Sequence, residues 1–147
     1  MSPDAETRGA LLFELNQIRK ELSVLSRMLG KTRHLGRDEV QIRAAASSLQ
    51  SVYNGIEKIL ETVLKNEGYS VKAGPSSHSD VINSAESMGI VSTALAASLR
   101  NLMAFRHFYR HSYGFMIDNE LLNPLLQNVD DMVRSLAEEL HLEQSGA

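Results

Sequence analysis

A short segment of the sequence, residues 105–115, concentrates side chains that can bind a phosphate and move a proton. It reads Phe-Arg-His-Phe-Tyr-Arg-His-Ser-Tyr-Gly-Phe and holds more than half of the chain's four phenylalanines and four tyrosines. Arginine can hold phosphate oxygens through two parallel hydrogen bonds, and histidine can transfer a proton near neutral pH. RNA carries its own nucleophile, the 2′-hydroxyl, so these residue types could cleave an RNA phosphodiester without a metal ion.

Helical spacing can direct two of these side chains to one ligand. An α-helix turns about 100° and rises about 1.5 Å per residue, so Arg106 and His111 lie about 140° apart around the axis and about 7.5 Å apart along it. The long side chain of Arg106 can cover that separation. We predict that its guanidinium and the imidazole of His111 converge on one phosphate, with aromatic rings nearby that stack on unpaired bases.

Residues of this segment also have ordinary structural interpretations. Phe105 and Phe108 are more typical of a core than of a platform for bases. A histidine near a helix end, such as His111, often only places a favourable charge at the negative end of the helix dipole. The side chains of Arg100 and Arg110 could both be solvated.

His107 and His111 are four residues apart, which is also the spacing of paired metal ligands on a helix. The neighbouring arginines would repel a cation, however, and no glutamate follows His107 as it does in the metalloprotease motif. We therefore predict no metal site and no cofactor. His78, at the end of the glycine- and serine-rich stretch 68–79, is interpreted as part of a plain connection, because nothing near it in the sequence supports a role in a site.

The order Arg106, four residues, His111, one residue, Tyr113 resembles the R-x4-H-x-Y signature of HepT-type ribonuclease toxins of the HEPN superfamily. The specific signal covers about residues 105–118. The resemblance implies a metal-independent RNA endonuclease whose catalytic residues, here Arg106 and His111, lie at the interface of a two-fold homodimer. In that family a polar residue, commonly Asn or Asp, follows the arginine. His107 stands there instead, and we treat it and Arg110 as auxiliary site residues.

The same resemblance implies a partner enzyme. In such systems a minimal nucleotidyltransferase antitoxin (MNT) attaches AMP to the motif tyrosine, which corresponds to Tyr113. An adenylylated Tyr113 would place a bulky anion beside Arg106 and His111 and could occupy the phosphate pocket. The implied function is a toxin of a type II- or VII-like toxin–antitoxin system, with tRNA or mRNA as the substrate.

Two other functions fit the same residues. The chain could be a non-catalytic HEPN-type helical module that binds a nucleotide or a nucleotidyltransferase. It could also be a helical bundle that serves only assembly. Cleavage of RNA in the presence of EDTA separates the first hypothesis from these two.

Composition limits the protein class. With 147 residues, 43% of them hydrophobic, the chain can form a single domain, 1–147, with a real core. A net charge of −3 excludes a strongly basic coat for nucleic acid. Two copies of segment 105–115 across a two-fold axis would still make one basic cleft. The absence of cysteine removes disulfides, thiolate zinc sites and cysteine nucleophiles.

We expect a soluble, cytoplasmic protein that does not enter a membrane. No run approaches the roughly 18–20 apolar residues that span a bilayer. The first residues, Met-Ser-Pro-Asp-Ala-Glu-Thr, are polar and acidic, unlike a secretory signal.

Apolar residues recur every three or four positions along most of the chain, which predicts helices. A first helix begins near Pro3 and Asp4 and ends at Gly30 as a left-handed C-cap. A second begins at 36–38, runs to about Lys65 and is closed by Gly68. The short connection between them predicts an antiparallel hairpin.

The second half predicts three more helices. A short one begins at Ser79 or Asp80 and ends near Met88, and a longer one runs from the cap Ser92 to Gly114. The last region begins at 118–119, and there Pro124 either starts the helix, with Asn123 as its cap, or kinks it. No strand pattern occurs. The fold class is all-α, an antiparallel bundle of four main helices plus one short helix, HEPN-like.

Overall fold

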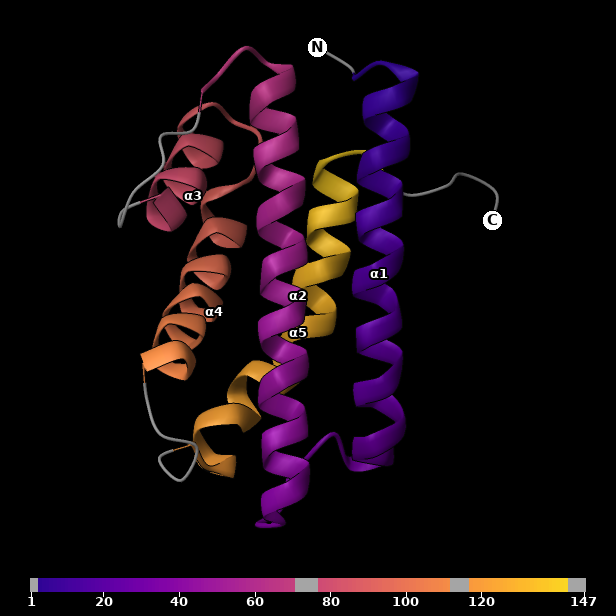
Figure 1. Cartoon of the computed structure of the whole chain (residues 1–147), viewed down its shortest axis with the longest axis vertical. Coiled ribbons are helices and arrows are strands. Elements are labelled where there is room, and N and C mark those ends of the chain that lie inside the picture. Colours follow the sequence, from indigo (N-terminus) through magenta and orange to yellow (C-terminus); the bar gives the residue numbers. More distant parts are fainter. Residues whose placement is uncertain (1–2, 71–76, 112–116, 143–147) are drawn as a thin grey trace.

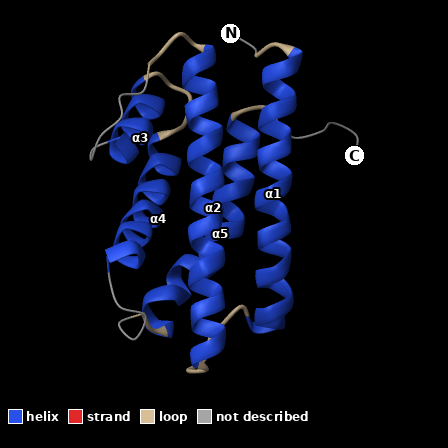
Figure 2. Ribbon diagram, in the orientation of Figure 1, coloured by secondary structure: helices blue, strands red, loops and turns tan. Residues whose placement is uncertain are grey.

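Five α-helices make up most of the computed structural model, which describes residues 3–70, 77–111 and 117–142. In chain order they are α1 (Ala5–Leu29), α2 (Glu39–Asn66), α3 (Ser77–Ser87), α4 (Thr93–His111) and α5 (Asn119–Glu139), with a 3-10 turn, η1 (Gly30–Thr32), after α1. Figure 2 shows helices and loops, and the described part contains no strand. The predicted all-α class and the order of one short and four longer helices are confirmed.

The second helix, α2, is the centre of the bundle. Figure 1 shows α1 and α2 side by side and antiparallel, as the short connection predicted, with α3 and α4 on the other side of α2. The helix α2 packs against all four other α-helices. No helix of the described chain is both long and apolar enough to cross a membrane.

Helix starts lie where short polar side chains can cap them. Asp4, Asp38 and Asp118 each accept a hydrogen bond from the backbone N–H three residues later, at 2.7, 3.0 and 2.9 Å. The Ser92 hydroxyl accepts one from the N–H of Leu95 at 3.1 Å. These bonds satisfy backbone donors that have no partner within the helix. The predicted starts at all four residues are confirmed.

The end of α1 differs in detail from the prediction. Gly30 is the C-cap, but its φ of +68° goes with a ψ of −157°, which is not the left-handed helical region. The left-handed residue is Arg33, at φ 53° and ψ 30°, after the 3-10 turn. The Arg33 guanidinium is bound to the Asp130 carboxylate and to the carbonyl of Leu126. Residues other than glycine rarely adopt this left-handed conformation. At Arg33 it occurs together with these contacts to α5.

The helix α5 runs through Pro124, and Asn123 is not its cap. The buried Asn123 amide instead accepts from the N–H of Leu35 at 2.7 Å and donates to the carbonyl of Leu35 at 3.0 Å. Those bonds fasten the α1–α2 connection to α5. In Figure 1 the first turns of α5 lie at an angle to the rest of the helix, as expected where proline removes a backbone hydrogen bond. Of the two predicted alternatives, the kinked helix is the one found.

The helices α1 and α2 approach closely at Gly55. A Cβ atom added there would lie 2.7 Å from Cγ1 and 3.0 Å from Cδ1 of Ile18, which is buried. We expect Gly55→Ala to lower the free energy of unfolding. Overpacking typically costs about 1–3 kcal/mol, more than the gain of about 1 kcal/mol in helix propensity.

Urea unfolding followed by circular dichroism measures this effect. The matched background is Ile18→Ala, which removes both atoms that the new methyl group would meet. In that background the same Gly55→Ala change should stabilise the protein, because only the propensity gain remains. An equal loss of stability in both backgrounds would contradict the steric explanation.

Candidate active site

The C-terminal half of α4 carries the motif residues, and its inner side is anchored in the core. Leu99, Leu102 and Phe105 are buried, and Phe108 is half-buried against the same core. The core interpretation of both phenylalanines is confirmed. The rings of Phe105 and Tyr109 lie 5.9 Å apart in a tilted arrangement. This packing fixes the helix face from which Arg106 projects.

The Arg106 side chain reaches across to α2 and α3. Its Nε–H donates to Oδ1 of Asn54 at 2.8 Å, and its Nη1 lies 3.2 Å from Nε2 of His78. The guanidinium carbon is 6.0 Å from the centre of the Tyr53 ring, at the limit for a cation–π contact. Three side chains from two other helices thus surround one guanidinium.

His78 is bound in turn by a carboxylate. Its Nδ1 lies 2.8 Å from Oε1 and 2.6 Å from Oε2 of Glu57. An ionised carboxylate only accepts hydrogen bonds, so the partners assign the proton to Nδ1. In the neutral ring Nε2 then accepts from Nη1–H of Arg106. We call Asn54, Glu57, His78 and Arg106 the Arg106 network.

The contact between His78 and Arg106 shows that the interpretation of His78 as part of a plain connection is wrong. The helix α3 begins at Ser77, slightly earlier than predicted, so His78 lies within its first turn. Packing of α3 against α2 and α4 brings it to Arg106, which is 28 residues away in the chain. No sequence signal near His78 could have shown this. For Asn54 and Glu57 the sequence gives only a weak signal, namely two polar residues three positions apart on α2.

His111 lies apart from the Arg106 network within one subunit. It is the last residue of α4, it is exposed, and its ring centre is 4.5 Å from that of His107. Among the described residues, no contact joins His111 to Arg106. Arg110 is also exposed. Convergence of Arg106 and His111 on one phosphate stays a prediction, and Tyr113 and Gly114 lie outside the described residues.

Tyr53 is a buried residue next to the Arg106 network. Its side chain is buried, and its hydroxyl lies close to the Glu57 carboxylate without a hydrogen bond of regular geometry to the described part of the protein. Burial, and after it the negative charge of Glu57, raise the pKa of this hydroxyl well above its ordinary value. Tyr53 is therefore a neutral phenol at physiological pH.

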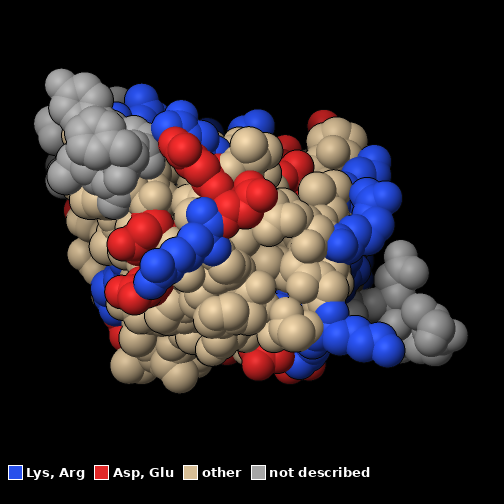
Figure 3. All heavy atoms as spheres, turned by 90° about the horizontal axis from the view of Figure 1, so that it is seen from below, with Lys and Arg blue, Asp and Glu red and all other residues tan. Residues whose placement is uncertain are grey.

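Charges are distributed unevenly over the face seen in Figure 3. Acidic and basic side chains mingle over its centre, and basic side chains gather along its right edge. The net charge of the chain is −3. Within the described ranges, no group of three or more His, Asp or Glu side chains is arranged to hold a metal ion. A polyanion such as RNA would therefore have to be recognised by a local site and not by a strongly basic surface.

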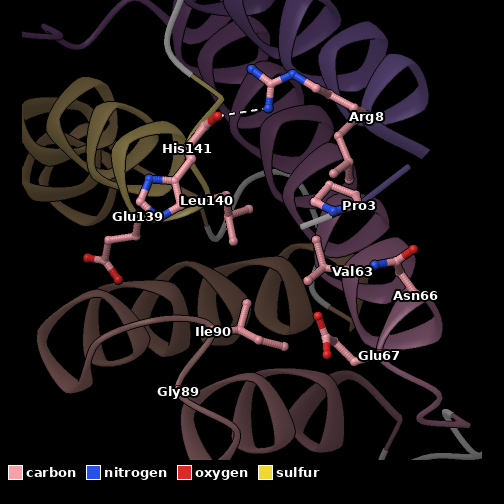
Figure 4. A pocket seen from close by; sticks show the side chains of 11 residues that line it. Pro3, Arg8, Val63, Asn66, Glu67, Gly89, Ile90, Glu139, Leu140 and His141 are labelled. Atoms are coloured by element: carbon pink, nitrogen blue, oxygen red, sulfur yellow. Dashed lines mark hydrogen bonds between the residues drawn. The ribbon is translucent and has the colours of Figure 1, made fainter. Parts of the chain in front are cut away.

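A cavity of about 460 Å³ lies elsewhere, and Figure 4 shows its lining. Residues of the Arg106 network do not line it. Two of its charged residues bind other chain segments: Arg8 donates to the carbonyl of His141 at 2.9 Å, and the Glu139 carboxylate accepts from the N–H and the hydroxyl of Ser92. These bonds tie chain segments together, so we place the candidate chemistry at Arg106 and not here.

A comparison with protein families gives one match. The model of the family described as HepT-like protein matches residues 44–144, from the first turns of α2 past the end of α5. That range includes the whole Arg106 network. Searches of curated proteins and of solved structures gave no match.

Proposed function

Because the chain belongs to the HepT-like family of HEPN proteins, we propose that it is a metal-independent RNA endonuclease, the toxin of a toxin–antitoxin pair. The observation that most supports this is the guanidinium of Arg106, which Asn54 and His78 hold in place while the residue stays partly exposed. A guanidinium fixed in this way needs little reorganisation to bind the charge that develops on a phosphate during cleavage.

In the proposed reaction the RNA supplies the nucleophile. Arg106 binds the non-bridging phosphate oxygens, and His111 transfers a proton. The 2′-oxygen forms a bond to phosphorus while the bond from phosphorus to the 5′-oxygen breaks. The products are a 2′,3′-cyclic phosphate and a 5′-hydroxyl, and the substrate is tRNA or mRNA.

Two subunits are proposed to share this site. Within one subunit the described contacts of Arg106 run to α2 and α3, whereas His111 is exposed at the end of α4. A two-fold axis near the end of α4 would set His111 of one copy beside Arg106 of the other. It would also bring His107 and Arg110 of both copies into one basic cleft on an acidic protein.

Neutralisation is proposed to act on the same cleft. An MNT-type antitoxin would attach AMP to Tyr113, two residues after His111. The added phosphate carries a negative charge that Arg106 can bind, so the modified side chain would compete with RNA. Both proteins would meet in the cytoplasm.

Cleavage of RNA in EDTA tests the proposed activity. We expect the wild-type protein to cleave in EDTA, and His111→Ala to be slower by about 10²–10⁴-fold because a proton-transfer group is lost. His34→Ala is the matched control, since it removes another exposed histidine, in the α1–α2 connection. Cleavage that continues unchanged in His111→Ala would refute the assigned role of His111.

A non-catalytic module that binds a nucleotide or a nucleotidyltransferase is the second candidate. It is favoured by the lack of a described contact between Arg106 and His111, since a binding site needs Arg106 alone. If neither the wild type nor the variant cleaves RNA while AMP binding is retained and depends on Arg106, this function replaces the first.

A further inference from the structure

The geometry points to a second proton-transfer group at this site: we propose that His78, oriented by Glu57, is the general base that takes the proton from the 2′-hydroxyl. The inference rests on the proposed ribonuclease function. It assigns His78 as a catalytic residue and Glu57 as a positioning residue, both outside segment 105–115.

Cleavage by 2′-hydroxyl attack moves two protons. One leaves the 2′-oxygen as it bonds to phosphorus, and the other must reach the departing 5′-oxygen. The two oxygens lie on opposite sides of the phosphorus, so one imidazole serves both poorly. His111 can supply only one of the two groups, and the reaction calls for another close to the phosphate.

His78 meets the geometric requirement for that group. Its Nε2 lies 3.2 Å from Nη1 of Arg106, so a phosphodiester bound by this guanidinium would come within hydrogen-bond reach of Nε2. The side chain of His78 is 38% exposed, which leaves it open to a ligand. Nε2 carries the lone pair of the neutral ring, which a general base requires. In the structure that lone pair accepts from Nη1–H of Arg106, so this N–H must turn to the bound phosphate before Nε2 can accept the 2′-hydroxyl proton.

Glu57 completes the pair. Its side chain is only 15% exposed, and both of its oxygens lie within 2.8 Å of Nδ1 of His78. A carboxylate in this position holds the ring in one tautomer and stabilises the imidazolium that forms after proton uptake. That stabilisation matters here, because a charged His78 would stand next to the Arg106 cation.

A purely structural role for His78 is disfavoured by the rest of the α3–α4 contact. Val81, Ile82 and Ala85 of α3 are buried in the core. Farther along, Arg100 of α4 donates to Asn83 at 2.7 Å and to Glu86 at 2.6 Å on α3. The two helices are thus joined without the half-exposed His78.

Nε2 of His78 takes the 2′-hydroxyl proton as the bond from the 2′-oxygen to phosphorus forms. The bond from phosphorus to the 5′-oxygen breaks, and that oxygen takes a proton from His111. Proton exchange with water then returns His78 to its neutral form and His111 to its protonated form.

A pair of matched RNA substrates tests this assignment. One has the normal 5′-oxygen at the cleavage site, and the other has sulfur in its place, which leaves as a thiolate without needing a proton. We expect His78→Ala to lose about 10²–10⁴-fold in kcat on both substrates, as for loss of a general base. His111→Ala should regain most of its activity on the sulfur substrate only.

Glu57→Gln and Arg100→Ala complete the set. Glu57→Gln should lower kcat at least about tenfold, since it removes the orienting charge, with KM changed by no more than about twofold. Arg100→Ala breaks the other polar link between α3 and α4 and should leave kcat and KM at wild-type values. Thermal unfolding of each variant identifies any that fails to fold.

The outcomes are distinct. Wild-type kcat in His78→Ala, recovery of His78→Ala on the sulfur substrate, or an equal loss in Arg100→Ala would each overturn the assignment of His78 as the base. In all three cases wild-type cleavage in EDTA would leave the ribonuclease function standing. Absence of wild-type cleavage overturns both proposals.

Discussion

Replacing Arg106 with alanine is expected to lower kcat for RNA cleavage by at least about 10³-fold, the usual effect of removing an arginine that binds transition-state charge on a phosphate. Arg106 donates to Asn54 and His78 through two different nitrogens. With RNA bound, Nε–H would keep its bond to Asn54 while the Nη N–H groups bind phosphate oxygens. Lysine has a single nitrogen and cannot make these contacts together. The kcat of Arg106→Lys should therefore exceed that of Arg106→Ala by less than about tenfold.

Single-turnover cleavage of a labelled RNA measures this effect. Arg100→Ala is the matched control, because Arg100 is also on α4 and also bonded to α3, but through Asn83 and Glu86. Asn54 is exposed and His78 is half-exposed, so both can be solvated when Arg106 is lost, and the variant should fold. Full activity in Arg106→Ala would remove Arg106 from the site.

The same variant shows whether two subunits share the site. Arg106→Ala and His111→Ala are each expected to be inactive, yet a mixture that exchanges subunits should regain about a quarter of wild-type activity. Half of the dimers would then be mixed, and one of the two sites in each mixed dimer would hold both intact residues. A mixture that stays inactive would mean that the two residues act within one subunit.

Cells that produce Tyr113→Phe are expected to stay poisoned when the nucleotidyltransferase antitoxin is co-expressed, although the same antitoxin protects cells that produce the wild-type chain. Phenylalanine lacks the hydroxyl that would receive AMP, so the anion that competes with RNA for Arg106 cannot be attached. Colony counts, together with the intact mass of the purified protein, measure the outcome.

Tyr109→Phe is the control for the tyrosine prediction. Tyr109 lies on α4 four residues earlier, half-buried, with its ring beside Phe105. Cells that produce this variant should still be protected by the antitoxin, and the variant protein should still gain the mass of one AMP. Protection that survives Tyr113→Phe would show that the antitoxin acts in another way.

The helices could be predicted because their signals are local. An aspartate or serine accepts a hydrogen bond from a backbone N–H three residues later, and both partners are visible in a short window of sequence. The end of α1 was less predictable. Its left-handed residue is Arg33, and Arg33 is bound to Asp130 on a helix almost a hundred residues away. The choice between a kink and a start at Pro124 likewise depended on the bonds of Asn123 to Leu35.

The candidate site was predictable only where its residues share one helix. Arg106 and His111 could be proposed from their spacing alone, since both lie on α4. The partners of Arg106 come from α2 and α3, at sequence separations of 52 residues for Asn54 and 28 for His78. Such separations are closed by the packing of whole helices, which no local pattern encodes.

The turn of α2 that presents Asn54 to Arg106 and Glu57 to His78 also contains Gly55, against which Ile18 of α1 packs closely. Any larger residue at that point would push the helix axis, and with it the amide and the carboxylate on the adjoining face. Filling this seam would therefore lower both the stability of the bundle and the turnover of the site. Through Ile18, the first helix therefore constrains the position of the candidate site, although none of the proposed reacting groups belongs to it.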